Sequence, residues 1–450
     1  MTGTEILAKI NSADSTALFE KLYGPEGVEA QRVRYRSLAE ATLRDFPETE
    51  ADLHLFTAAG RTELGGNHTD HNHGRVLAAS IQLDAVAFVS PRKDNRVIFR
   101  STGYPDVVVD ISETAPIPGE TGTTEALVRG IAAQFTQRRV PVRGFTANAN
   151  STVLSGSGLS SSAAVEVLFG TIFDGLYGGG KRSAVEIAQM GQKAENLYFG
   201  KPCGLMDQVA SASGGAVAID FADPARPVVQ RVNFDLASAG YALCVVDTGG
   251  SHADLTADYA AVPSEMKAVA QLCGGQVLRD ISKETLFQRS KEIRSALGDR
   301  ALLRALHFLA ENERVSAMLA ALEDADSAKT AEEKRTAIDG YLDLVNESGN
   351  SSWELLQNVF TPKNPKEQGV SVALAMTGDF LRSLGERTTT GKRLGGAYRV
   401  HGGGFAGTIQ AYIPQKDLDA YIRWMGSVFG PQAVTVLRIR PIGAAELRFF

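Results

Sequence analysis

Residues 60–74 limit how this chain can fold more than any other stretch. They place an arginine, carboxylates, amides and three histidines among four glycines. This segment offers many hydrogen-bonding groups and little apolar surface with which to offset the cost of ordering them. It cannot be ordinary core, and we expect it to form a binding surface.

Two further segments are equally rich in glycine and small polar residues. Residues 155–164 run from a Gly/Ser loop into apolar residues that are typical of a helix start. The backbone N–H groups of such a loop, with the helix dipole behind them, form an anion site suited to a polyphosphate. Residues 402–408 form the third segment, and the alternating residues 409–413 that follow it predict a strand.

In this order, the three segments resemble the three motifs of the GHMP small-molecule kinases, and the first is most similar to the galactokinase signature. Between them, residues 194–195 and 203–208 resemble the galactokinase segment that holds a metal-binding glutamate and the catalytic aspartate. The resemblance covers roughly residues 56–450, because shorter matches follow at residues 258–259, 304–307, 311–314 and 346–348.

The resemblance implies an α+β fold, the GHMP kinase two-domain arrangement of mixed sheets and helices, with the active site in the interdomain cleft. We expect an N-terminal domain at 1–222, with the sugar motif and the phosphate loop, and a C-terminal domain at 223–450. The implied activity is that of an ATP-dependent sugar 1-kinase, in which ATP and α-D-galactose give α-D-galactose 1-phosphate and ADP. The alternatives are a kinase for another galactose-like sugar, such as galacturonate, and a non-catalytic sensor of galactose and ATP.

The resemblance also assigns roles to single residues, and it implies ATP and Mg²⁺ as ligands beside the sugar. The catalytic residues are Arg61 and Asp207. The residues that contact the sugar are Asn67, His68, Asp70, Gly204 and Tyr259. The residues that bind the ATP phosphates are Gly156, Ser157, Gly158, Leu159, Ser160, Ser161 and Ser162. The residues that hold Mg²⁺ are Ser162 and Glu195.

Phosphoryl transfer needs little covalent help from a protein but much positioning and charge stabilisation. By resemblance, Asp207 accepts the proton of the anomeric hydroxyl or polarises it. Arg61, again by resemblance, lies close enough to lower the pKa of that carboxylate and to steady the transferred phosphoryl group.

The first segment departs from the galactokinase pattern at two positions. Asn67 stands where the family usually has a glutamate, and Ala59 stands where it usually has a proline. The family's glutamate reads the C6 hydroxyl of the sugar, whereas a neutral amide both donates and accepts hydrogen bonds. We therefore expect weaker discrimination at C6.

The histidines of the first segment allow a metal site as an alternative. The residues His68, Asp70, His71 and His73 have the imidazole and carboxylate groups that suit zinc or iron. No second histidine cluster in the sequence completes such a site, and alternating residues on a short loop cannot all face one ion. Sugar binding is the favoured interpretation.

The third segment satisfies a dinucleotide-binding pattern literally, with glycines at 402, 404 and 407. That pattern requires a preceding strand and a following helix, whereas this segment leads into a predicted strand. We expect instead that its glycine turns pack against the phosphate loop.

With 450 residues, 44% hydrophobic and 22% charged, the chain can bury one large core or two medium ones, and we expect two domains. A net charge of -6 gives no overall attraction for nucleic acid or anionic membrane, so local dipoles and metal must hold a nucleotide. Three scattered cysteines predict buried thiols in a reducing compartment. There is no signal-peptide pattern and no apolar run of about 18 residues, so we expect a cytoplasmic protein. We expect a monomer rather than an oligomer.

Along the chain, residues 5–45 predict helices punctuated by Pro25 and Gly27. Within them, residues 28–45 predict an inserted helix, because the spacing to the first motif exceeds that usual in the family. Mixed strands and helices follow to residue 221, and residues 221–227 are the best linker or turn. The C-terminal half predicts a strand at 241–246, a helical region at 256–388, a strand at 408–413, a helix at 416–428 and a strand at 434–440.

Overall fold

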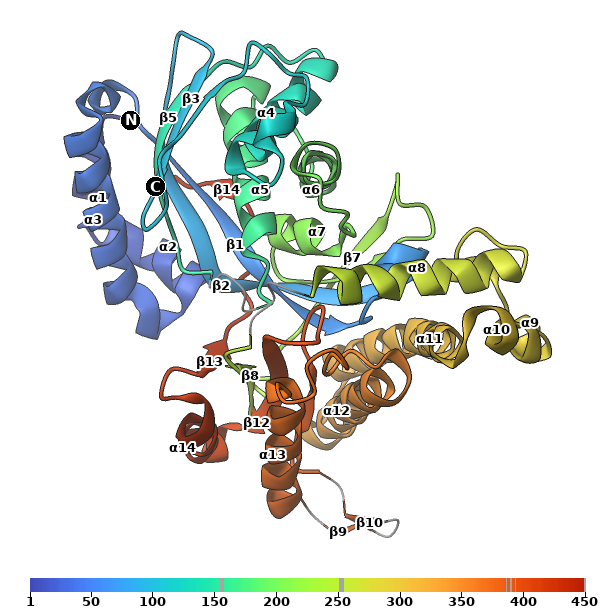
Figure 1. Cartoon of the computed structure of the whole chain (residues 1–450). Coiled ribbons are helices and arrows are strands. Elements are labelled where there is room, and N and C mark those ends of the chain that lie inside the picture. Colours follow the sequence, from blue (N-terminus) through green and yellow to red (C-terminus); the bar gives the residue numbers. More distant parts are fainter. Residues whose placement is uncertain (154–157, 251–254, 386, 389–390, 393, 449–450) are drawn as a thin grey trace.

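The computed structural model describes residues 1–153, 158–250, 255–385, 387–388, 391–392 and 394–448. Two β-sheets form its framework, and helices cover both faces of each (Figure 1). The fold is α+β, as predicted from the sequence.

The larger sheet has eight strands, in the order β14-β1-β2-β5-β3-β4, with β6 and β7 attached to β2. Strand β2 is 17 residues long, so it pairs with β5 along one half and with β6 along the other. The strands of this sheet are β1 His54–Gly65, β2 Arg75–Pro91, β3 Arg96–Ser101, β4 Val107–Asp110, β5 Phe145–Ser151, β6 Ala216–Asp220, β7 Val228–Val232 and β14 Ala445–Glu446.

One face of this sheet is covered by three N-terminal helices, α1 Gly3–Ile10, α2 Asp14–Tyr23 and α3 Val28–Asp45 (Figure 1). Their apolar residues pack on Leu55 and Phe88, which point to the same face because strand side chains alternate. The inserted helix predicted at 28–45 is confirmed as α3.

The opposite face of the sheet is covered by helices that follow in the chain. Phe56, Val89 and Phe145 pack there against the first three of these helices. The last of them packs on the β2–β6 end of the sheet. The four helices are α4 Thr124–Gln137, α5 Ser161–Phe173, α6 Ala184–Ala194 and α7 Met206–Ser213.

The smaller sheet has the order β11-β12-β8-β13. One face packs on α13 Gly369–Leu384 and α14 Leu418–Phe429. The other face packs on α11 Asp299–Ser327 and α12 Ala331–Ser351. Its strands are β8 Tyr241–Asp247, β11 Ala397–Val400, β12 Thr408–Pro414 and β13 Val434–Leu437.

The strand predicted at 434–440 ends earlier than expected, at Leu437. Residues 438–440 leave the smaller sheet and run beside the larger one, where Gln82 N donates to Arg438 O at 3.0 Å. Arg440 there bonds the buried Asp84 at 2.5 Å. The predicted strand is thus divided: residues 434–437 pair within the smaller sheet, and residues 438–440 contact β2 of the larger one.

The predicted helical region at 256–388 consists of several helices and ends at Leu384, after which β9 Arg387–Thr388 pairs with β10 Gly391–Lys392. Its helices before α13 are α8 Thr256–Leu272, α9 Lys283–Gln288, α10 Ser290–Leu297, α11 Asp299–Ser327 and α12 Ala331–Ser351.

Residues 221–227 form the turn between β6 and β7, two antiparallel strands of the larger sheet. The larger sheet therefore takes in β7 and β14 from beyond residue 222. The division into domains at 1–222 and 223–450 stays a prediction.

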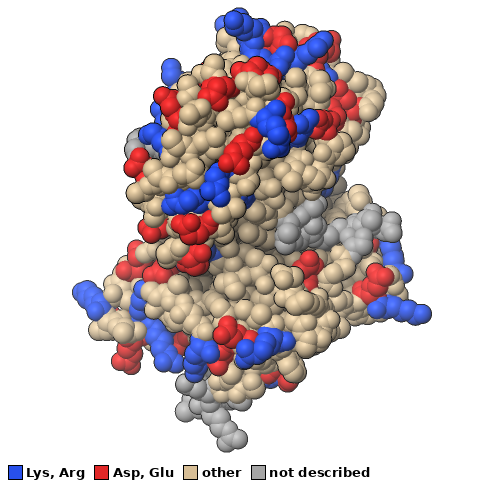
Figure 2. All heavy atoms as spheres, turned by 90° about the vertical axis from the view of Figure 1, so that its left-hand side faces the viewer, with Lys and Arg blue, Asp and Glu red and all other residues tan. Residues whose placement is uncertain are grey.

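The surface toward the N-terminal helices carries acidic and basic side chains intermixed, without a broad area of one sign (Figure 2). Among the helices that the structure describes, none has both the length and the hydropathy to cross a membrane. Cys244 is buried, whereas Cys203 and Cys273 are only half-buried, so the prediction of buried thiols holds for one of the three. Cys203 lies on the loop before α7 and Cys273 at the end of α8, where neighbours cover them less fully.

Candidate active site

The second glycine-rich segment leads into helix α5, which begins at Ser161. Ser160, before the helix, has φ 58°, and Gly158 has φ 70°. A Cβ on Gly158 would lie 2.9 Å from the Thr408 hydroxyl oxygen, so a glycine is needed both for the backbone and for the space. Ser162 is exposed in the first turn of the helix, whereas Leu159 is buried. The predicted phosphate residues Gly156 and Ser157 lie outside the described residues.

Asp207 lies in the first turn of α7 and forms a bidentate ion pair with Arg61 of β1. Its two carboxylate oxygens accept from Arg61 Nε at 2.7 Å and Nη2 at 2.9 Å. Burial raises the pKa of Asp207, but the Arg61 guanidinium outweighs it and holds the pKa below the ordinary value. The Asp207 side chain is 34% exposed and Arg61 only 5%, so the carboxylate reaches solvent while the guanidinium is held from behind.

Two further contacts tie this ion pair to the phosphate loop. Ser160 Oγ donates to Asp207 Oδ2, and Arg61 Nη1 donates to the carbonyl of Gly158. The backbone N–H of Arg61 also donates to Leu159 O at 3.2 Å. The two predicted catalytic residues and the described part of the phosphate loop thus form one cluster.

Asp70 and Gly204, two predicted sugar residues, lie against each other. Asp70 begins a short 3₁₀ turn after β1, and Gly204 lies on the loop before α7. A Cβ on Gly204 would overlap the Asp70 carboxylate, so a larger residue there would displace that side chain. The contact brings the sugar motif to the loop that carries Asp207.

Three consecutive carbonyls of the third glycine segment accept four side-chain hydrogen bonds, one of them from Asn358 Nδ2 to Gly403 O at 3.1 Å. Asn67 Nδ2 donates to Gly402 O at 2.6 Å, and Tyr259 donates to Gly404 O at 2.9 Å. His68 Nε2 lies 2.9 Å from Gly403 O, and a carbonyl only accepts, so that nitrogen carries the proton. Burial lowers the pKa of His68 to about 4, so its ring is neutral at pH 7.

These contacts also bring the third segment to the phosphate loop. A Cβ on Gly402 would lie 3.5 Å from the carbonyl oxygen of Gly158. The expected packing of the third segment's glycine turns against the phosphate loop is confirmed.

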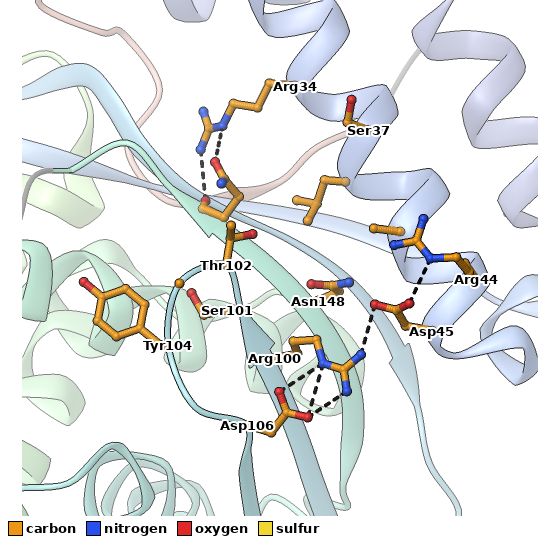
Figure 3. A pocket seen from close by; sticks show the side chains of 14 residues that line it. Arg34, Ser37, Arg44, Asp45, Arg100, Ser101, Thr102, Tyr104, Asp106 and Asn148 are labelled. Carbon is orange, nitrogen blue, oxygen red and sulfur yellow. Dashed lines mark hydrogen bonds and ion pairs between the residues drawn. The ribbon is translucent and has the colours of Figure 1, made fainter.

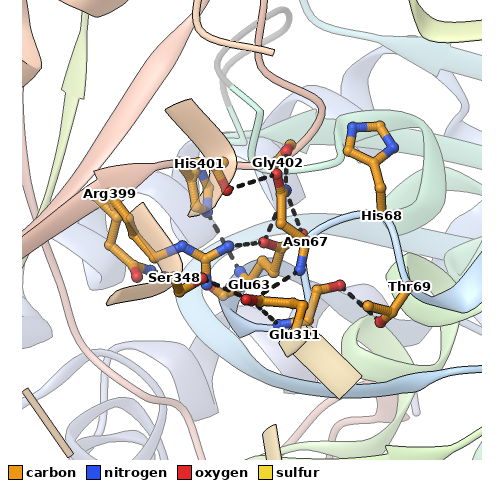
Figure 4. A network of polar contacts seen from close by, with 12 residues as sticks. Glu63, Asn67, His68, Thr69, Glu311, Ser348, Arg399, His401 and Gly402 are labelled. Carbon is orange, nitrogen blue, oxygen red and sulfur yellow. Dashed lines mark hydrogen bonds and ion pairs between the residues drawn. The ribbon is translucent and has the colours of Figure 1, made fainter. Parts of the chain in front are cut away.

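Asn67 is fully buried in a network of polar contacts (Figure 4). Besides Gly402, its Nδ2 donates to Glu63 at 3.1 Å. Its Oδ1 accepts from Asn358 at 2.8 Å and from Ser352 at 3.4 Å. Both polar atoms of this side chain therefore have protein partners. The prediction that Asn67 contacts the sugar stays a prediction.

A second part of the network holds the backbone of the sugar motif. Glu311 accepts from Gly66 N at 3.1 Å and from Ser348 Oγ at 2.6 Å, and Arg314 bonds its other oxygen. Burial raises the pKa of Glu311, but His307 and Arg314 lower it by a larger amount. The resulting pKa is about 2, below the ordinary value. The motif is thus anchored on a buried, charged glutamate of helix α11.

Several residues of this network escaped the sequence analysis. Glu63 stands inside the first segment, and Glu311 and Ser348 stand in the matches at 311–314 and 346–348, but nothing in their spacing indicated a buried network. The residues without any sequence signal are Asn358, Arg399 and His401.

Glu195, a predicted metal ligand, begins a π-helical turn that continues α6. It is buried, and its Oε2 accepts from Gln208 Nε2 at 3.1 Å, while the same nitrogen donates to Glu166 at 3.0 Å. Ser162 stands one helical turn before Glu166 on α5, so the two share a face of that helix.

Within the described residues, no group of three or more His, Cys, Asp and Glu side chains is placed to hold a metal ion. That observation covers the cluster of histidines and Asp70 in the first segment as well as Glu195. The pairing of Ser162 with Glu195 at a metal stays a prediction.

The chain matches two families along its N-terminal half. Residues 44–91 match the galactokinase galactose-binding signature, and residues 126–215 match the GHMP kinases N terminal domain. The galactokinase of Streptomyces coelicolor is 30% identical over 390 residues, which is 86% of this chain and 91% of that protein. The galactokinase of Glaesserella parasuis is 31% identical over 377 residues, which is 81% of this chain and 86% of that protein.

Solved structures share the fold. Lactococcus lactis galactokinase, complexed with galactose, superposes with a TM-score of 0.74 at 23% identity, over 92% of this chain and 100% of that one. The mevalonate kinase of Methanococcus jannaschii gives a TM-score of 0.55 at 14% identity, over 86% of this chain and 98% of that one.

Proposed function

The chain belongs to the galactokinase family of GHMP kinases, and we propose that it transfers the γ-phosphoryl group of ATP to the anomeric hydroxyl of α-D-galactose. It is a sugar kinase, a phosphotransferase with an alcohol group as acceptor. The observation that carries the assignment of the reacting site is the Asp207–Arg61 pair, whose carboxylate is open while its guanidinium is buried.

Asp207 orients the anomeric hydroxyl and receives its proton as the sugar oxygen attacks the γ-phosphorus. The new O–P bond forms as the bond to the β-phosphate oxygen breaks, and ADP leaves. The lowered pKa of Asp207 makes it a weak base, which suits a loose transition state in which the proton moves late. The Ser160 hydroxyl donates to Oδ2 of the same carboxylate, and Oδ1, which accepts only from Arg61 Nε, can accept from the sugar hydroxyl as well.

Arg61 has two tasks in this proposal. It keeps Asp207 ionised through two hydrogen bonds, and its positive charge lies beside the path of the transferred group. The N-terminus of α5, which begins at Ser161, supplies backbone N–H groups and the helix dipole to the ATP phosphates. Arg61 also bonds the carbonyl of Gly158, so the phosphate loop and the reacting carboxylate keep a fixed spacing.

Mg²⁺ fits the residues near Glu195 by donor chemistry, because carboxylate and hydroxyl oxygens are the ligands that it prefers. Glu166 Oε1 and Gln208 Oε1, two buried oxygens beside Glu195, have no hydrogen-bond partner within the described residues. Ser162 and Glu195 would hold the ion. Bound with ATP, it would neutralise charge on the β- and γ-phosphate oxygens.

Galactose binding rests on Asp70, His68, Gly204 and Tyr259. Asp70 presents a carboxylate that accepts from sugar hydroxyls, and Gly204 leaves room for it. His68 uses Nε2–H on Gly403, so its Nδ1 lone pair faces away from that bond and is available to accept from a hydroxyl. Tyr259 packs edge-on against Phe405, with 5.5 Å between ring centroids, and shapes the wall of the site.

Asn67 has two possible roles, which one experiment separates. Its four hydrogen bonds favour a positioning role, in which it holds His68 and the third glycine segment in register. A direct role in reading C6 would require the amide to leave those partners.

The comparison to make is kcat/KM for galactose against 6-deoxygalactose and galacturonate, in wild type and Asn67→Ala. A positioning residue lowers all three values together, and the ratios stay within about threefold. A residue that reads C6 shifts the ratios by roughly 5- to 150-fold, the effect of one lost hydrogen bond of about 1–3 kcal/mol.

The protein acts as a monomer in the cytoplasm in this proposal. Support for a reducing compartment comes from its cysteines, all three of which are free thiols. Sedimentation velocity of the purified chain at several concentrations tests the monomer. A second, concentration-dependent boundary would replace it with an oligomer.

A coupled ADP-release assay with a panel of hexoses and uronic acids tests the proposed reaction. Galactose should be the preferred acceptor, and the product should be the 1-phosphate by ³¹P NMR. ADP release that does not depend on any sugar, or a phosphate found at another hydroxyl, would overturn the assignment.

A further inference from the structure

Helix α3 builds a cavity that the kinase reaction does not use. The cavity has a volume of about 540 Å³ and lies between α3 and the strands β3 and β5 (Figure 3). Small-molecule sites commonly measure about 300–1,000 Å³. We propose that this cavity binds a neutral saccharide.

The cavity is separate from the kinase site. It lies on the face of the larger sheet that α1, α2 and α3 cover, whereas α5 and α7, with the phosphate loop and Asp207, lie on the opposite face (Figure 1). All but the last two residues of α3 precede the galactose-binding signature at 44–91. A ligand here therefore needs no contact with ATP or the reacting sugar.

Asn148 is the strongest indication of a ligand. Its side chain lines the cavity from β5 and is only 4% exposed (Figure 3). Within the part of the chain that the structure describes, its amide has no hydrogen-bond partner. Two residues further along β5, Asn150 accepts from Arg34 Nε at 2.7 Å, so its amide oxygen is occupied. The polar atoms of this amide open into the cavity, where a ligand that both donates and accepts hydrogen bonds would pair with them.

Each charged side chain that lines the cavity has an ion-pair partner in the protein. Arg100 bonds Asp106 at 2.7 Å and Asp45 at 3.0 Å, and Arg44 bonds Asp45 at 3.2 Å. The third arginine of the lining, Arg34, bonds Asp84 at 2.7 Å, a buried residue that does not line the cavity. An anion would have to break these charge-assisted pairs, whereas a neutral ligand can share their free lone pairs and N–H groups.

The remaining walls suit a sugar ring. Tyr104 stands at the rim with 63% of its surface exposed, and Leu38 and Ala41 of α3 form an apolar side. Ser101 and Ser37 add hydroxyl groups. An aromatic face beside amides and hydroxyls matches a saccharide, which has apolar C–H surfaces and a rim of hydroxyls.

Equilibrium dialysis of the full chain with radiolabelled galactose, glucose and lactose tests the proposal. Ala41→Trp fills the cavity, and Glu40→Trp is its matched control, because Glu40 is exposed on the same helix and does not line the cavity. For at least one sugar, Ala41→Trp should bind one molecule per chain fewer than wild type, and Glu40→Trp should bind as many. The three sugars distinguish the kinase's own substrate from another saccharide.

Two milder variants guard against misfolding of Ala41→Trp. Tyr104→Ala at the exposed rim and Asn148→Ala inside should each weaken that binding at least tenfold, with kinase activity unchanged. Labelled orthophosphate should not bind to the cavity. Equal sugar binding in wild type and all four variants would overturn the proposal, as would phosphate binding that Ala41→Trp removes.

Discussion

Two arginine–carboxylate pairs join distant parts of this chain, and they differ in what the carboxylate can reach. Arg61 and Asp207 are 146 residues apart, and Asp207 is 34% exposed. Arg399 and Glu63 are 336 residues apart, and both side chains are sealed, at 0% and 2% exposure. The first pair has an open carboxylate that a substrate can contact, and the second can serve only the fold. Pairing alone therefore does not distinguish a reacting group from a structural one.

Burial and a neighbouring arginine compete over the pKa of each carboxylate, and the two pKa values shift in opposite directions. Burial opposes charge in both, but only at Asp207 does the arginine outweigh it and lower the pKa. At Glu63, burial wins over Arg399 and raises the pKa. The open pair keeps its charge easily, whereas the sealed pair holds charge at a cost.

The largest expected effect comes from breaking the open pair. Asp207→Asn should lower kcat by roughly 10²–10⁴-fold, the usual range for a lost acid–base group, with ATP and galactose binding retained. Steady-state kinetics and calorimetric titration measure the two quantities. Asp223→Asn, in the β6–β7 turn, is the control and should behave as wild type. A near-normal kcat for Asp207→Asn would remove this carboxylate from the reaction.

Breaking the sealed pair should affect stability instead of turnover. Arg399→Met leaves Glu63 buried without its ion-pair partner, which costs about 3–5 kcal/mol of unfolding free energy. Arg382→Met, which removes an exposed pair with Asp379 at 3.7 Å, should cost less than about 1 kcal/mol.

Urea unfolding measures both variants and the double variant Glu63→Met/Arg399→Met. The double variant should recover part of the loss, because no lone charge remains buried. If Arg399→Met were as stable as Arg382→Met, the sealed pair would contribute nothing to the fold.

A smaller effect should follow from disturbing the loop to which Arg61 is bonded. Gly158→Val introduces a branched residue at φ 70° and places its Cβ 2.9 Å from the Thr408 hydroxyl oxygen. Strain of about 1–2 kcal/mol should raise the Kd for ATP roughly tenfold and leave galactose affinity unchanged. Gly180→Val has a similar φ of 65° in open space, so it controls for the backbone alone. If the two variants bound ATP with equal affinity, this loop would not be part of the ATP site.

The smallest effect concerns acid stability around the sealed pair. The pKa of Glu311 is about 2, below its ordinary 4.5, so its contribution to stability is complete above pH 4.5 and is lost toward pH 2. Between pH 6 and pH 3.5 the wild type should lose about 1 kcal/mol that Glu311→Gln does not lose. Glu313→Gln, exposed on the same helix, should follow the wild type. Urea titrations at both pH values measure the unfolding free energies. If all three proteins lost the same amount, the lowered pKa of Glu311 would not account for the loss.

The sequence predicted best where the signal is local. Pro25 and Gly27 predict the start of α3, and the Gly/Ser sequence of the phosphate loop predicts the helix that begins at Ser161. The meeting of Arg61 with Asp207 followed from the family resemblance, because no local pattern places β1 against α7.

Local sequence did not predict a residue's role where its partner lies hundreds of positions away. Arg399 and His401 are ordinary polar residues on a strand until the fold puts them beside Glu63 and Thr62. The motif around Asn67 predicts a residue that contacts the sugar. In the structure, its amide is bonded to buried partners such as Ser352 and Gly402, which favours a positioning role. Such assignments depend on which surfaces become interior, and local sequence does not encode that.

The return of residues 438–447 to the larger sheet has a consequence for synthesis of the chain. Arg440 is 383 residues beyond Thr57 and 356 beyond Asp84, so both wait for it during synthesis, and β1 lacks its neighbour β14 as well. A ribosome-bound intermediate therefore carries a buried acid with one cation missing and a strand edge open to other chains. The larger sheet can therefore complete its contacts only after residue 447 has been made.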